Sequence, residues 1–158
     1  MPTNKIGDME VSVIALGCFA FGGDHQTGSH LGGAFAALHD GLWGEQPEED
    51  TFATVKAALA AGVNFFDNAE MYGGGYAEEV TGRALRASGF PRGAYHIATK
   101  VSESNLAPAL LREHCEASIA RLGCGYIDLY QLHWKSEAAL RTDKYPDRPL
   151  VRHLASHD

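Results

Sequence analysis

Apolar runs with the character of buried β-strands alternate with amphipathic segments over the first 134 residues, and this alternation limits the chain to few folds. The runs Val63–Asp67, His96–Lys100 and Tyr126–His133 end in polar residues at positions 67, 100 and 133, a constant spacing of 33. Strands that alternate with helices predict a parallel sheet with right-handed crossovers. We therefore expect an α/β fold.

Three amphipathic helices are expected, one before each of these strands. They lie between Pro47 and Gly62, over Ala77–Ser88 and over Ala107–Leu122. Acidic residues after Pro47 suit the positive end of a helix dipole, and Gly62 suits a helix C-terminus. In the last helix the expected apolar stripe consists of Leu110, Leu111, Cys115, Ile119 and Leu122.

The N-terminal residues predict a short antiparallel hairpin followed by one more strand. The hairpin is expected over Lys5–Val13 around the turn Gly7-Asp8, and the strand over Val13–Cys18. Residues Gly22–Gly44 lack clear periodicity, which indicates a long loop with a short helix near residues 34–38. After Trp134 the pattern fails, and a short helix near residues 136–140 is the only element expected there.

Composition excludes several classes of partner. A formal net charge of -7 disfavours nucleic acid and anionic membranes. The 3 cysteines are odd in number and form no CxxC motif, so neither a disulfide framework nor a zinc site is indicated. The spacing of His25, His30 and His39 fits no metal-ligand pattern. No secretory signal or membrane-spanning run is found, so we expect a soluble, cytoplasmic protein.

Four polar residues follow the last three predicted strands. They are Asp67, Tyr72, Lys100 and His133. Each alone is more often a turn, solvated or packing residue, but parallel strands bring their C-terminal ends to one edge of the fold, where catalytic groups collect. An acid, a phenol, an amine and an imidazole at one edge indicate proton and hydride chemistry.

These same segments resemble the aldo-keto reductase family. The segment Phe65–Gly73 resembles the family's Asp and Tyr-Gly signature, Ile97–Val101 its lysine strand, and Tyr126–Trp134 its histidine strand. Lys5–Gly17 is similar to its N-terminal hairpin and first strand. The likeness covers roughly residues 3–134. It implies a partial TIM-type (β/α) barrel of about four parallel strand–helix units, preceded by a short N-terminal β-hairpin.

The resemblance also implies a role for each strand-end residue. Tyr72 would be the general acid, and Lys100 would stabilise its phenolate. Asp67 would hold Lys100 by an ion pair and contribute to cofactor binding. His133 would bind and orient the substrate carbonyl and assist proton transfer. The hydride would come from NADPH, with no metal, and the substrates would be aldehydes, ketones or sugars.

The chain also departs from the family pattern. Asn68 stands where the family usually has Thr, and we expect little effect. A complete (β/α)₈ barrel takes about 250 residues. We expect residues 1–134 to be the N-terminal half of one and residues 135–158 to be a divergent, poorly ordered tail. The alternative function is a truncated, inactive fragment or interaction module, and exposed strand edges predict self-association.

Two further alternatives concern the chemistry and the substrate wall. Lys100 suits a Schiff-base aldolase as well, which borohydride trapping would reveal. A Rossmann fingerprint and a Walker A loop are both absent. The aromatic residues Phe19, Phe21, Trp43 and Trp134 would either pack in the core or add an apolar wall to a substrate site.

Overall fold

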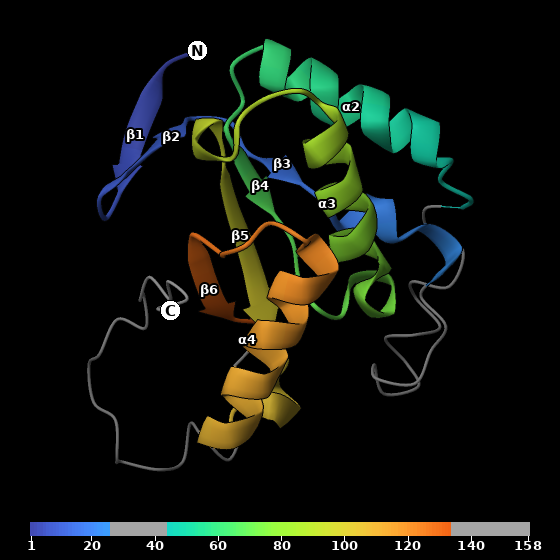
Figure 1. Cartoon of the computed structure of the whole chain (residues 1–158), viewed down its shortest axis with the longest axis vertical. Coiled ribbons are helices and arrows are strands. Elements are labelled where there is room, and N and C mark those ends of the chain that lie inside the picture. The colour runs from blue at the N-terminus through green and yellow to red at the C-terminus, as the bar shows by residue number, and fades with distance from the viewer. Residues whose placement is uncertain (26–43, 134–158) are drawn as a thin grey trace.

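A computed structural model describes residues 1–25 and 44–133, which form a two-stranded and a four-stranded sheet (Figure 1). The antiparallel hairpin consists of β1 (Thr3–Ile6) and β2 (Met9–Ser12), joined at Gly7-Asp8. The parallel sheet consists of β3 (Leu16–Gly17), β4 (Phe65–Asp67), β5 (His96–Val101) and β6 (Leu129–Leu132). The strands lie in the order β3-β4-β5-β6, so strands of this sheet that follow one another along the chain are neighbours.

In the described part of the chain three α-helices follow one another along one side of the parallel sheet (Figure 1). They are α2 (Glu48–Ala60), α3 (Tyr76–Ala87) and α4 (Pro108–Leu122). Four short 3₁₀ segments connect the larger elements: η1 (Phe19–His25), η2 (Tyr72–Gly75), η3 (Arg92–Ala94) and η4 (Glu103–Asn105). This arrangement confirms the expected α/β fold and its strand–helix units, preceded by the hairpin. Within the described ranges no helix has the length and apolar character needed to cross a bilayer.

Successive side chains of the strands point to opposite faces of the sheet. Phe66 and Ile97 face the helices and are fully buried. The opposite face carries a second apolar cluster, in which Phe65, Ala98 and Leu129 pack with Met9 and Val11 of the hairpin. Burying one such Phe or Leu side chain contributes roughly 1.5–3 kcal/mol. The hairpin therefore covers part of the sheet face that lies away from the helices.

The strand predicted over Val13–Cys18 is wrong at its start, because β3 consists of Leu16 and Gly17 alone. Val13 and Ile14 are 57% and 58% exposed. The chain bends here between the hairpin and the sheet: the Ser12 hydroxyl donates to the Ile14 carbonyl at 2.6 Å. The prediction was wrong here because Val13 and Ile14 are apolar but do not pair with a neighbouring strand.

The inward stripe predicted for α4 is confirmed at Cys115 and Leu122, which are buried. It is wrong for Leu110, which is 38% exposed. Ser118, a polar residue that the pattern did not select, is fully buried, and its hydroxyl accepts from Arg121 at 3.0 Å, which offsets the cost of burial.

Other predictions fall on residues outside the described ranges. These are the short helices near residues 34–38 and 136–140 and the whole tail 135–158. The proposed division into residues 1–134 and 135–158 therefore stays a prediction. Of the predicted loop Gly22–Gly44, the first residues belong to η1.

Helices α3 and α4 approach closely at Gly82. A Cβ atom at this position would overlap the carbonyl oxygen of Leu122, which is backbone and has no rotamer to change. We expect Gly82→Ala to lower the free energy of unfolding by about 1–3 kcal/mol, the usual effect of overpacking. Urea unfolding measures this. Gly93→Ala is the matched control, because nothing lies within 4 Å of its Cβ position, and equal losses for both variants would contradict the prediction.

Candidate active site

The Lys100 ammonium group is the centre of the predicted cluster. Its Nζ forms an ion pair with Asp67 Oδ1 at 2.8 Å, donates to the Asn68 carbonyl at 2.7 Å and donates to the Tyr72 hydroxyl at 3.2 Å. An ammonium has three N–H donors, so these three acceptors use all of them. The Lys100 side chain is 13% exposed and that of Asp67 36%. A lysine whose Nζ is engaged in three such contacts is not the free amine that a Schiff base requires.

Sheet geometry brings Asp67 and Lys100 together. Residue 67 lies opposite Ala98 in the β4–β5 register, two residues before Lys100. Phe65 and Ala98, two residues before Asp67 and Lys100, belong to the hairpin-covered cluster. Strand alternation therefore puts Asp67 and Lys100 on that same face, at the C-terminal end of the strands.

Tyr72 reaches the site from the loop after β4. The centroid of its ring lies 4.8 Å from that of the Phe19 ring and 5.5 Å from that of the His133 ring. Lys100 Nζ lies 4.9 Å from the centroid of the Tyr72 ring. The next residue, Gly73, has φ +59, and its backbone packs against Gly22, where a Cβ would lie 2.8 Å from the Gly73 nitrogen. Two glycines thus allow η1 and η2 to meet and hold Tyr72 between aromatic neighbours.

Asn68 stands at the position where the aldo-keto reductases that the sequence resembles usually have Thr. Its side chain is fully buried and hydrogen-bonded. Its side-chain amide donates to Thr81 Oγ1 at 3.0 Å and to the Ala77 carbonyl at 3.3 Å, both on α3. Its backbone carbonyl is one of the three acceptors of Lys100. Asn68 therefore ties the loop to α3 and sets one ligand of the ammonium group.

The His133 imidazole lies at the end of β6, with its backbone amide donating to the Val101 carbonyl at 2.9 Å. Burial, together with the positive charge of Lys100, lowers its pKa from 6.5 to about 4. The ring is therefore neutral near pH 7. A neutral imidazole has one N–H that can donate to a carbonyl oxygen.

This lowered pKa predicts a pH dependence of stability. Between about pH 6.5 and pH 4 the unfolded chain binds a proton at His133 that the folded chain does not, so stability is full above 6.5 and is lost as the pH falls toward 4. We expect His133→Asn to lose less unfolding free energy than the wild type when the pH falls through this window. Urea unfolding at several pH values tests this, and parallel curves for the two proteins would contradict it.

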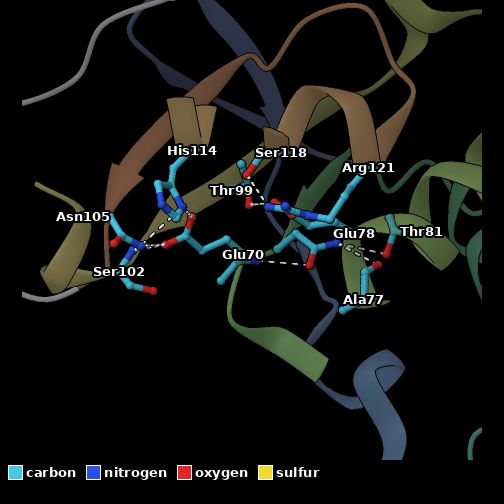
Figure 2. A network of polar contacts seen from close by, with 12 residues as sticks. Glu70, Ala77, Glu78, Thr81, Thr99, Ser102, Asn105, His114, Ser118 and Arg121 are labelled. Atoms are coloured by element: carbon cyan, nitrogen blue, oxygen red, sulfur yellow. Dashed lines mark hydrogen bonds and ion pairs between the residues drawn. The ribbon is translucent and has the colours of Figure 1, made fainter. Parts of the chain in front are cut away.

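Two buried carboxylates near the site were missed by the sequence reasoning (Figure 2). Glu78 of α3 is fully buried, forms an ion pair with Arg121 Nε of α4 at 2.6 Å and accepts from the Thr99 hydroxyl at 2.5 Å. Glu70, between Asp67 and Tyr72, is 9% exposed. No local pattern marks either acid as buried, because their partners come from distant parts of the chain.

The remaining candidates are distributed as follows. Phe19 contacts Tyr72, whereas Phe21 belongs to the helix-side core. Trp43 and Trp134 lie outside the described residues, as do His30 and His39. In residues 1–25 and 44–133, no three His, Cys, Asp or Glu side chains gather as a metal site would require. The three cysteines have free thiols.

Comparison with known proteins identifies relatives along most of this chain. The family model described as "Aldo/keto reductase family" matches residues 31–142. An aldo-keto reductase of Mycobacterium marinum is 39% identical over 124 residues, which is 78% of this chain and 39% of that protein. The chain therefore spans about two fifths of the length of this curated relative.

Solved structures give the same result. A thermostable aldo-keto reductase in complex with the inhibitor epalrestat is 28% identical, with a TM-score of 0.69 over 87% of this chain and 44% of that one. An aldo-keto reductase from Klebsiella pneumoniae in complex with NADPH is 27% identical, with a TM-score of 0.64 over 87% of this chain and 41% of that one. With its α/β fold, its strand-end cluster and these relatives, the chain belongs to the aldo/keto reductase family.

Proposed function

We propose that the protein is an NADPH-dependent oxidoreductase that reduces aldehyde or ketone carbonyls and catalyses the reverse oxidation of alcohols. The observation that carries this proposal is the contact of Lys100 Nζ with both Tyr72 Oη and Asp67 Oδ1. In this arrangement an ammonium group, held by a carboxylate, lies beside a phenol. Asp67, Tyr72, Lys100 and His133 are the proposed catalytic residues.

The direction of the Lys100 bond supports Tyr72 as the proton donor. Because Lys100 donates to the phenol oxygen, the phenolic proton has to point to another acceptor, and a substrate carbonyl oxygen is one. When hydride adds to the carbonyl carbon, Tyr72 transfers its proton to the oxygen and the product is an alcohol. The adjacent ammonium group stabilises the phenolate that remains.

Neutral His133 and the apolar ring of Phe19 suit a bound carbonyl compound. The imidazole N–H would donate to the same carbonyl oxygen and orient it toward Tyr72. The rings of Phe19 and His133 both lie against Tyr72, so a substrate that reaches the phenol also meets them. A small carbonyl compound is the proposed partner, and the proposed location is the cytoplasm.

The residues present fit a nicotinamide cofactor in part. NADPH supplies a hydride when bound. Asp67, with its side chain 36% exposed, keeps acceptor capacity for a hydroxyl group of the cofactor while it pairs with Lys100. We propose Asp67 as a cofactor-binding residue on this ground.

Titration of the purified chain with NADPH tests the proposal. We expect cofactor binding by fluorescence and a loss of nicotinamide absorbance that depends on added aldehyde. The second candidate is an inactive fragment or interaction module of the same family. Absence of NADPH binding at high concentration would support that candidate and contradict the first. Light scattering of the same sample tests the predicted self-association.

A further inference from the structure

Glu70 is a buried acid in the middle of the loop that carries Asp67 and Tyr72. It lies three residues after the first and two before the second, and it is 9% exposed. A buried carboxylate is unfavourable unless hydrogen bonds replace the lost water.

Three partners surround the Glu70 carboxylate, and all come from the chain after β5 (Figure 2). Oε1 accepts from the Ser102 backbone amide at 2.7 Å and from Asn105 Nδ2 at 2.9 Å. Oε2 lies 2.7 Å from Nδ1 of His114 on α4. Burial raises the pKa of this carboxyl. The hydrogen bonds from Ser102, Asn105 and His114 together lower it by more, so the net pKa lies below its ordinary value. The group is ionised at neutral pH and accepts from all three.

The backbone on both sides of this carboxylate is hydrogen-bonded to β5 itself. The Asn68 amide donates to the Ala98 carbonyl at 2.8 Å, and the Glu70 amide donates to the Lys100 carbonyl at 3.1 Å. These two bonds continue the β4–β5 ladder past the end of β4. The carboxylate adds a third attachment one step further on, at the Ser102 amide.

We propose that Glu70 is a positioning residue, which fixes the loop of Asp67 and Tyr72 to the end of β5 and so sets the contact between Lys100 and the Tyr72 hydroxyl. This contact, at 3.2 Å, is the longest of the three that Lys100 makes. A small movement of the loop therefore breaks it first. The expected effect on turnover rests on the proposed function, whereas the effect on the accessibility of Lys100 does not.

Asp128 offers a matched control at the other end of β5. Like Glu70 it is a buried acid, and it is 8% exposed. Each of the two carboxylates has three partners: a backbone amide, a histidine and one further side chain. Its partners are the Ile97 amide at 2.8 Å, Arg92 at 2.5 Å and His96 at 3.3 Å. Loss of either acid destabilises the sheet, but only Glu70 contacts the loop of the site.

Lysine labelling measures the proposed effect without requiring activity. The folded variants are reductively methylated and digested, and the labelling rate of Lys100 is read by mass spectrometry against the exposed Lys5 and Lys56. We expect Glu70→Ala to raise the relative rate of Lys100 about fivefold through local opening. Asp128→Asn, compared at matched stability, should leave it unchanged. If the wild type turns over, kcat of Glu70→Ala should fall roughly 10²-fold, with a smaller change in KM.

A second variant covers the case in which Glu70→Ala does not fold. Asn105→Ala combined with His114→Ala removes two partners and leaves Glu70 in place, and we expect it also to raise the labelling of Lys100. Unchanged labelling in the folded variant, or an equal rise in Asp128→Asn, would overturn the proposal. A wild type without turnover would contradict the proposed function alone, and the labelling result would still decide on Glu70.

Discussion

Tyr72→Phe is expected to remove turnover and to leave NADPH affinity nearly unchanged. The phenyl ring keeps the contacts with Phe19 and His133, but it has no hydroxyl to receive the Lys100 bond or to give a proton to substrate. Loss of a general acid lowers kcat by roughly 10²–10⁴-fold. The loss of nicotinamide absorbance with an aldehyde substrate measures the rate, and cofactor fluorescence measures binding.

Tyr76→Phe is the matched control for this substitution. The Tyr76 hydroxyl, four residues further along the chain, donates to Glu48 Oε1 at 3.2 Å between α3 and α2. The proposed mechanism gives Tyr76 no role, so the kcat of this variant should equal that of the wild type. An active Tyr72→Phe protein would remove Tyr72 from the mechanism, whatever the control does.

Arg121→Met is expected to cause the largest loss of stability. It leaves the carboxylate of Glu78 fully buried without its cation, since the side chains of this pair are 25% and 0% exposed. Breaking one partner of a buried pair lowers the free energy of unfolding by about 3–5 kcal/mol. A domain of ordinary stability, about 5–15 kcal/mol, loses a large part of its margin. Urea unfolding at neutral pH measures the change.

Two comparisons sharpen this test. Arg83→Met breaks the exposed pair with Glu48, whose side chains are 38% and 46% exposed, and should change the unfolding free energy by only about 0–1 kcal/mol. Adding Glu78→Leu to Arg121→Met removes the orphaned charge and should restore much of the loss. Similar losses in Arg121→Met and Arg83→Met would show that burial does not govern the energy of the α3–α4 pair.

The fold was predictable because it follows from the alternation of strands and helices. Parallel topology predicted that the strand ends meet at one edge, and the family resemblance predicted the ion pair of Asp67 and Lys100, which the structure has at 2.8 Å. The helix positions followed equally from periodicity and from glycine and proline signals. Periodicity was wrong at Val13 and Ile14, where an apolar stretch forms the bend between the hairpin and the sheet.

The supporting residues were not predictable, because no local signal distinguishes a buried acid from a solvated one. Glu70 finds His114 across 44 positions of the chain, and Glu78 finds Arg121 across 43. Each looks in the sequence like an ordinary polar residue of a loop or of the first turn of a helix. Their burial is decided by packing between elements that the sequence places far apart.

The order of strands β3-β4-β5-β6 has a consequence for how the chain acquires its structure. Within this sheet β4, β5 and β6 each pair with the strand of the sheet synthesised before them, so each finds its neighbour already present. Paired positions such as Asp67 and Ala98 are separated by one connecting helix only. The entropic cost of closing the loop is then similar for each strand that is added. The sheet can grow by addition at one edge, in the direction in which the ribosome releases the chain.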